Sequence, residues 1–501
     1  MSADQHSVPA KAGTQGQAAQ RLAAFGTLDA CFRRNTSEVL QRSRGGFART
    51  DAMRRAYTKG THRPASLARM GTTPPCDGRM RPALAAALSP YLLAHFAKSQ
   101  LWHASTLLFG FFLTEACGLS AAAMSGVMAA TLALNGVVDA ALGMRWRGRM
   151  VGLAGAARLQ LAATPATCLF FLSFCATPLV GAEARLPWAL ATLLAFRLAY
   201  PFIDVPQNAM VALAPLDEDG RCTLLARRNV ASGLASIAVG GLAGPLLIHG
   251  HADLPWLTWA AILSSLVCAT GWWLARSPIT GITAMPAQRD DDGVALRFAT
   301  ILAALAVMVA ASSLFRTLEP YYAAYAAGGI GLLLWAGIGG LVSQPAWLAC
   351  RRRVRTSGAL GAAALVLMLA ALILLGPLRA TAAGVILAGF GFGAGTSGLW
   401  LMLWAAMMRR AAAGGATGYV GVFTCVSKLA QAAAMLLLGR VLGASAYRDT
   451  LADPHSPPSL LIVAALATLA ATCVALALAC RQRAAPAAGL RVGRRNAVSG
   501  S

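Results

Sequence analysis

From about residue 84 onward, apolar stretches of bilayer-crossing length alternate with short polar segments. An α-helix needs about 20 apolar residues to cross the hydrocarbon core. The pattern predicts twelve such helices, near 88–113, 119–143, 158–181, 187–213, 229–250, 255–276, 298–324, 328–350, 358–376, 380–407, 419–443 and 458–480. We therefore predict an all-α polytopic membrane protein with twelve transmembrane helices in two six-helix halves.

The polar segments divide the chain into five parts. A basic extension over 1–83 is expected to be disordered and cytoplasmic, with translation from Met70 or Met80 as the alternative. The helical halves cover 84–276 and 298–480, a central cytoplasmic loop covers 277–297, and a basic tail covers 481–501.

Composition excludes a soluble globule and a disordered chain. Of the 501 residues, 57% are hydrophobic and 12% are charged, against about 25% charged in an ordinary soluble domain. The net charge of +24 comes largely from the extension, which contributes 14 − 5 = +9, and from alternate loops of the bundle. The positive charge therefore reports topology and does not indicate a nucleic-acid partner.

Arginines gather in every second loop, and the rule that basic loops face the cytoplasm fixes the orientation. We predict a multi-pass protein of the cell (inner) membrane with both termini cytoplasmic. The predicted cytoplasmic loops hold Arg145, Arg147, Arg149, Arg221, Arg227, Arg228, Arg276, Arg289, Arg351, Arg352, Arg353, Arg355, Arg409 and Arg410, whereas the opposite loops hold Arg185, Arg379 and Arg448.

Ionisable residues inside the predicted helices are functional candidates, because burying them in hydrocarbon costs about 2.5–3.5 kcal/mol each. Asp139 closes the second helix, one turn after Asn135. The alternative for Asp139 is that it reaches the interface or pairs with a loop arginine. Lys428 lies too deep in the eleventh helix to reach water and needs a carboxylate partner, either Asp139 or Asp204.

The fourth helix combines charge with proline in FRLAYPFIDVPQNAM. Arg197, Tyr200 and Asp204 are spaced to share one helix face. This spacing fits either a substrate site or an internal Arg197–Asp204 pair. In the seventh helix, the spacing of Arg316 and Glu319 favours a local ion pair.

No metal, nucleotide or hydrolase motif is present: GxxxxGK[ST], HExxH and GxSxG are all missing, and the cysteines and histidines do not cluster. We therefore expect no catalytic residues, no metal and no cofactor beyond a coupling ion, and we do not expect an enzyme.

Four segments resemble the glycoside–pentoside–hexuronide:cation symporters, the melibiose-permease-like branch of the major facilitator superfamily. They are FFLTEACGLSAAAMSGVMAATLALNGVVDAALG (111–143), YPFIDVPQNAMVALAPLDEDGRCTLLARRN (200–229), LEPYYAAYAAGG (318–329) and GYVGVFTCVSKLAQ (418–431). The resemblance covers about residues 90–480. It implies two halves that rock around a central site.

The resemblance also implies roles for individual residues. Asp204 and Tyr200 match the acid and tyrosine of the sugar and cation site, and Arg228 matches an arginine that helps to bind sugar. Asp139 matches the second acid of the cation motif, and Lys428 matches the lysine of the eleventh helix.

Three departures from the family pattern bear on coupling and substrate. Asn135 replaces the first acid of the cation motif, and Ser99, next to Lys98, replaces an acid of the first helix. The acids that follow the tenth span in the family are missing too, where this chain reads MMRRAAAGGATG. A single remaining carboxylate can titrate alone, which favours proton coupling over sodium. Arg197 has no counterpart in the pattern and would favour an anionic substrate.

We predict a monomeric secondary active transporter that moves a small polar solute, a sugar or sugar derivative, coupled to protons or a monovalent cation. The substrate-binding residues would be Asp204, Tyr200, Arg228, Lys428 and Arg197, and the coupling-ion residues Asp139, Asn135 and Asp204. The alternatives are an exporter or flippase of a lipid-like or secondary metabolite, a transport-silent sensor, and a membrane-embedded transferase.

Overall fold

The computed structural model describes residues 88–150, 152–243, 247, 253–277, 296–325, 332–451 and 453–482. These residues form helices joined by short turns, without a strand. The predicted extension over 1–83 lies outside the described residues, as do most of the predicted central loop over 277–297 and of the tail over 481–501.

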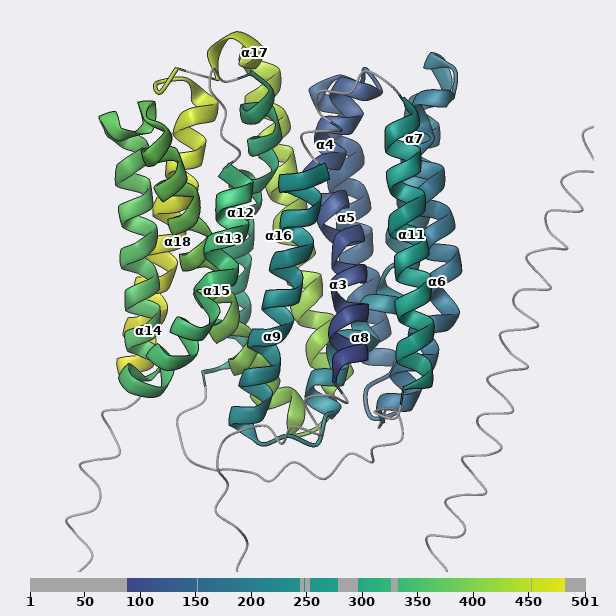
Figure 1. Ribbon diagram of the computed structural model, residues 1–501, viewed down its shortest axis with the longest axis vertical. Helices are drawn as coiled ribbons and strands as arrows, with labels where there is room; N and C mark the ends of the chain where they lie inside the picture. Colours follow the sequence, from purple (N-terminus) through teal and green to yellow (C-terminus); the bar gives the residue numbers. More distant parts are fainter. Residues whose placement is uncertain are drawn as a thin grey trace, which may run out of the picture. The chain divides into compact units, whose positions relative to one another are not determined.

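The helices of the first half lie together on the right of Figure 1, except α9, which lies near the middle. They are α3 (Ser89–His103), η1 (Ala104–Leu108), α4 (Phe109–Phe111), η2 (Phe112–Ala116), α5 (Ala121–Arg145), α6 (Leu153–Cys175), η3 (Thr177–Leu179), α7 (Ala182–Ala199), α8 (Pro201–Leu213), α9 (Glu218–Ser236), η4 (Ile237–Ala243) and α11 (Asp253–Arg276).

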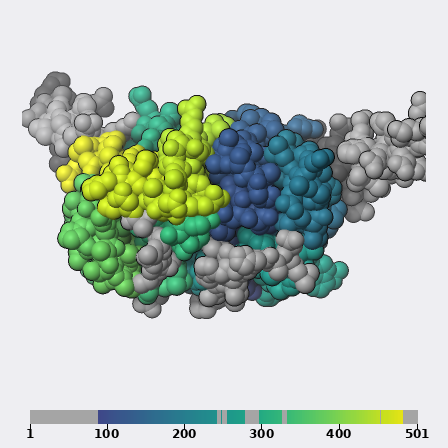
Figure 2. All heavy atoms as spheres, turned by 90° about the horizontal axis from the view of Figure 1, so that it is seen from above, coloured from purple at the N-terminus to yellow at the C-terminus, as the bar shows by residue number. Residues whose placement is uncertain are grey.

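The helices of the second half occupy the other side, as the separate green-yellow and blue regions of Figure 2 also show. They are α12 (Phe298–Tyr325), α13 (Leu332–Val342), α14 (Gln344–Leu375), η6 (Pro377–Ala380), α15 (Ala382–Ala412), α16 (Ala416–Ala444), α17 (Tyr447–Thr450) and α18 (Pro457–Gln482).

Nine helices in the described part of the chain are long and apolar enough to span a bilayer. The predicted spans near 88–113 and 229–250 are interrupted by π-helical turns, and the span near 328–350 is divided between α13 and the start of α14. The twelve-span count therefore stays a prediction. The basic segment predicted as the loop at 351–355 lies at a kink between two helices that are joined in α14, and Arg355 at the kink has a non-helical φ of 61°.

A proline interrupts the backbone hydrogen bonding of the fourth predicted span. The helix α7 ends at Ala199 and α8 begins at Pro201, with Tyr200 between them. Proline has no backbone N–H, so the carbonyl of Arg197, four residues earlier, loses its helical partner. The side-chain amide of Asn135 on α5 donates a hydrogen bond to that carbonyl instead.

The two halves pack closely along α5 and α16, where glycines face each other. A Cβ atom on Gly421 would lie 2.4 Å from the carbonyl oxygen of Asp139 and 2.8 Å from Cα of Gly143. Only glycine fits at this distance, and small residues at such contacts let membrane helices approach without a cavity.

Candidate functional site

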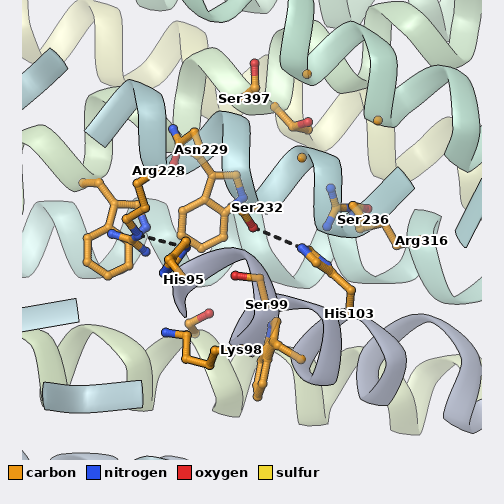
Figure 3. Close-up of a pocket in the computed structure, with 18 of the residues that line it drawn as sticks. His95, Lys98, Ser99, His103, Arg228, Asn229, Ser232, Ser236, Arg316 and Ser397 are labelled. Atoms are coloured by element: carbon orange, nitrogen blue, oxygen red, sulfur yellow. Dashed lines mark hydrogen bonds between the residues drawn. The ribbon is translucent and has the colours of Figure 1, made fainter. Parts of the chain in front are cut away.

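A cavity of about 210 Å³ lies between the two halves (Figure 3). Helices α3, α8 and α9 line it from the first half, and α12 to α16 line it from the second, with α14 contributing Gln344. Amide, hydroxyl and charged groups alternate along its wall with Trp102, Trp400 and Trp404. A concave site with convergent polar groups is the usual form of a small-molecule binding site.

Two lysine–carboxylate pairs form the charged centre. The ammonium of Lys98 donates a 2.6 Å hydrogen bond to Oδ1 of Asp204. The ammonium of Lys428 lies 2.6 Å from Oδ2 of Asp139, as an ion pair outside hydrogen-bond geometry, and 3.9 Å from Oδ2 of Asp204. All four residues are buried, so these charges depend on one another for compensation.

Neighbouring side chains hold this centre in place. The amide of Asn208, one turn beyond Asp204 on α8, donates to Oδ1 of Asp204 at 2.9 Å. The ring of Tyr200 stacks on Trp102 with centroids 5.4 Å apart. The ammonium of Lys428 lies 5.0 Å from the centroid of Trp102, where the electron-rich face of the indole adds a favourable cation–π contact.

Arg228 occupies another side of the cavity. Its guanidinium lies 4.0 Å from the ring centroid of Trp404, and its Nε donates to Nε2 of His95 at 3.3 Å. The other ring nitrogen of His95 is 3.2 Å from Oε1 of Gln207. The arginine is thus oriented by an aromatic face and a histidine, and no carboxylate within the described residues lies within 4 Å of it.

Four of the predicted substrate residues line the cavity: Asp204, Tyr200, Arg228 and Lys428. Asp139 lies behind Lys428 and is fully buried, so it neither reaches the interface nor pairs with a loop arginine.

Arg197 and Asn135 do not line the cavity. The guanidinium of Arg197 is fully buried, donates to the carbonyl of Ser105 at 3.1 Å and lies 5.1 Å from the ring centroid of Trp102. The alternative Arg197–Asp204 pair is wrong: Asp204 pairs with Lys98, and the guanidinium of Arg197 donates to the carbonyl of Ser105 instead. Asn135 binds the backbone of α7, as described above.

Several cavity residues were missed as site residues, and three of them, Lys98, His95 and His103, lie on α3. The sequence signal that could have identified these three residues is their position inside an apolar segment, where ionisable side chains are costly to bury. Lys98 stands beside the serine that replaces the family's acid, and its partner comes from α8, more than 100 residues later.

Ion pairs join the halves at both ends of the bundle. At the end with the basic loops, Glu218 of α9 lies 2.5 Å from Arg409 of α15 and 3.5 Å from Arg351 of α14. At the other end, Glu115 accepts hydrogen bonds from Tyr325 at 2.6 Å and from Tyr447 at 3.0 Å.

A helical membrane protein with two halves around a central polar cavity belongs to the class of solute transporters. The model of the MFS/sugar transport protein family matches residues 90–483, and the chain belongs to that family. The membership expected from the sequence motifs is thereby confirmed. Family and structural neighbours are transporters, not enzymes.

One relative is a protein named "Putative glycoside/cation symporter YagG" from Escherichia coli (strain K12), 31% identical over 169 residues. The match spans 32% of this chain and 36% of that protein. Similar solved structures include a bacterial homologue of the iron transporter ferroportin in an outward-facing state (TM-score 0.54, 13% identity, 79% of this chain and 100% of that one). Another, described under substrate recognition in proton-dependent oligopeptide transporters, has a TM-score of 0.56 at 12% identity, covering 79% and 98%. These likenesses show the fold alone.

Proposed function

We propose that the protein is a secondary active transporter that carries a small polar solute, a sugar or sugar derivative, by alternating access. The observation that carries this proposal is the polar cavity between the halves, with Asp204, Asn208 and Asn229 on its wall. Carboxylate and amide groups accept and donate the paired hydrogen bonds that adjacent sugar hydroxyls require. The similarity to a glycoside/cation symporter of E. coli agrees with this substrate class.

The coupling ion is a proton, or none, rather than sodium. Asp204 and Asp139 are the carboxylates of the charged centre, and each is 2.6 Å from a lysine ammonium. A sodium ion would have to displace an ammonium group from its carboxylate, at the cost of leaving a buried cation unpaired.

We further propose that the protein works as a monomer in the inner membrane, with both termini cytoplasmic. Arg351 and Arg409, from two of the predicted cytoplasmic loops, meet Glu218 at one end of the bundle, which agrees with that orientation.

Counterflow in proteoliposomes tests the function. The purified full chain is loaded with an unlabelled sugar, and entry of the labelled form is measured for a panel of monosaccharides, glycosides and sugar acids. Asp204→Asn should lose the exchange while remaining monodisperse, and Asp449→Asn, at an exposed site on α17, should exchange like the wild type. Full exchange by Asp204→Asn would contradict the assignment.

A further inference from the structure

An arginine without a carboxylate partner stands on the opposite side of the cavity from Arg228 in Figure 3. Arg316 of α12 lines the main cavity and also a second, smaller one of about 70 Å³. The predicted ion pair with Glu319 is wrong: Glu319 accepts a hydrogen bond from the backbone N–H of Leu333 at 3.1 Å. Within the described residues no carboxylate oxygen lies within 4 Å of the Arg316 guanidinium. Such a residue in a membrane interior is costly and marks a binding site by default.

Unused hydrogen-bonding groups lie beside this arginine. His103 of α3 is 7% exposed, and its Nε2 is 3.1 Å from Oγ of Ser232. Its Nδ1 has no partner among the described residues, and it lies close enough to Arg316 for the two to interact electrostatically. Ser236, one turn after Ser232 on α9, lines the same part of the cavity, next to Arg316 in Figure 3.

The charges around the cavity do not balance. Four cationic side chains line it, from Lys98, Arg228, Arg316 and Lys428. The carboxylates of Asp204 and Asp139 compensate the two lysines. The two arginines therefore leave an excess of two positive charges, which a neutral solute would not reduce and an anionic solute would.

We propose that Arg316, His103 and Ser236 form an oxyanion subsite that holds the acidic group of the transported solute. The substrate class is then a hydroxylated solute that bears a carboxylate, sulfate or phosphate; this inference rests on the proposed function. The guanidinium offers two parallel N–H groups to an oxyanion. The His103 ring donates from Nδ1 when the hydroxyl of Ser232 donates to Nε2.

The subsite also joins the halves. Arg316 belongs to the second half, whereas His103 and Ser236 belong to the first. An oxyanion bound to all three neutralises the charge of Arg316 in the second half and accepts hydrogen bonds from His103 and Ser236 in the first half. Binding of the acidic group therefore favours the state in which the halves are together, which links occupancy to alternating access.

Matched solute pairs that differ only in the acidic group test this inference. Counterflow by the purified full chain is measured for D-glucuronate against D-glucose, D-gluconate against D-glucitol, and glucose 6-phosphate against glucose. Inorganic phosphate alone distinguishes a free oxyanion from one carried by the solute. We expect an acidic member to exchange about tenfold or more faster than its neutral partner. Arg316→Gln should lower that preference about tenfold, and Arg316→Lys should retain part of it.

The control is Arg440→Gln, which removes the same charge at an exposed position of α16. If Arg316→Gln does not stay monodisperse, Ser236→Ala and His103→Gln supply the same readout. Equal exchange of both members of every pair, unchanged by these variants, would overturn the subsite and leave the proposed function standing. Exchange of inorganic phosphate alone at the same rate as the sugar acids would also overturn it. If the wild type exchanges no solute of either kind, the proposed function itself fails.

Discussion

Lys98 of α3 and Asp204 of α8 are joined by a 2.6 Å charged hydrogen bond inside the membrane-spanning bundle. Removing one partner leaves an uncompensated buried charge, which costs about 3–5 kcal/mol, whereas removing both can be nearly neutral. We predict that Lys98→Met and Asp204→Leu each lower the melting temperature in detergent, and that the double variant recovers most of the loss. Counterflow should be absent in all three. Additive losses in the double variant would contradict the pairing.

The hydrogen bond from Asn135 to the carbonyl of Arg197 replaces the one that Pro201 cannot make. Asn135→Ala should therefore cost about 1–3 kcal/mol, the usual cost of an unsatisfied buried polar group. Pro201→Ala restores a backbone N–H at the position that can bind the same carbonyl. The Asn135→Ala/Pro201→Ala double variant should consequently be more stable than Asn135→Ala alone.

The measurement for this prediction is thermal unfolding of the three purified variants beside the wild type. Pro206→Ala, which changes the next proline of α8, is the matched control and should not rescue Asn135→Ala. Rescue by both prolines to the same extent would mean that the effect is general helix stiffening and not the Arg197 carbonyl.

Transport should not depend on sodium. The lysine ammonium groups of Lys98 and Lys428 already occupy the carboxylates of the charged centre. Replacing external sodium with choline should leave the initial rate of counterflow or uptake within about twofold, because each carboxylate of the charged centre already faces a lysine ammonium. A strong sodium requirement would contradict the proposed coupling. The Asn135→Asp variant, which restores the acid of the family pattern, should not create a sodium requirement, since the new carboxylate would face the Arg197 carbonyl.

The sequence predicts the helices and the site to different extents. Apolar length locates the helices, and the cost of burying charge singles out Asp204, Asp139 and Lys428 as partners. A shared helix face does not fix the partners of its side chains: Asp204 pairs with Lys98 of α3, whereas Arg197 donates to a backbone carbonyl. The periodicity of the sequence also cannot show which side chains of distant helices pair with each other. Lys98 lies about as deep in its predicted span over 88–113 as Lys428 does in the span over 419–443, yet only the fold shows that its partner is Asp204.

Close packing of α5 on α16 should be required for transport. A side chain at Gly421 would meet the backbone of Asp139 and Gly143 at under 3 Å, so the two halves would have to separate. We predict that Gly421→Val lowers counterflow about tenfold or more, because the halves can no longer close against each other at this end. Gly126→Val is the matched control: it is also a helical glycine, on α5, but a Cβ atom there meets nothing within 4 Å. Equal loss in both variants would show that valine merely weakens the helices, whereas loss in Gly421→Val alone assigns the effect to the interface between the halves.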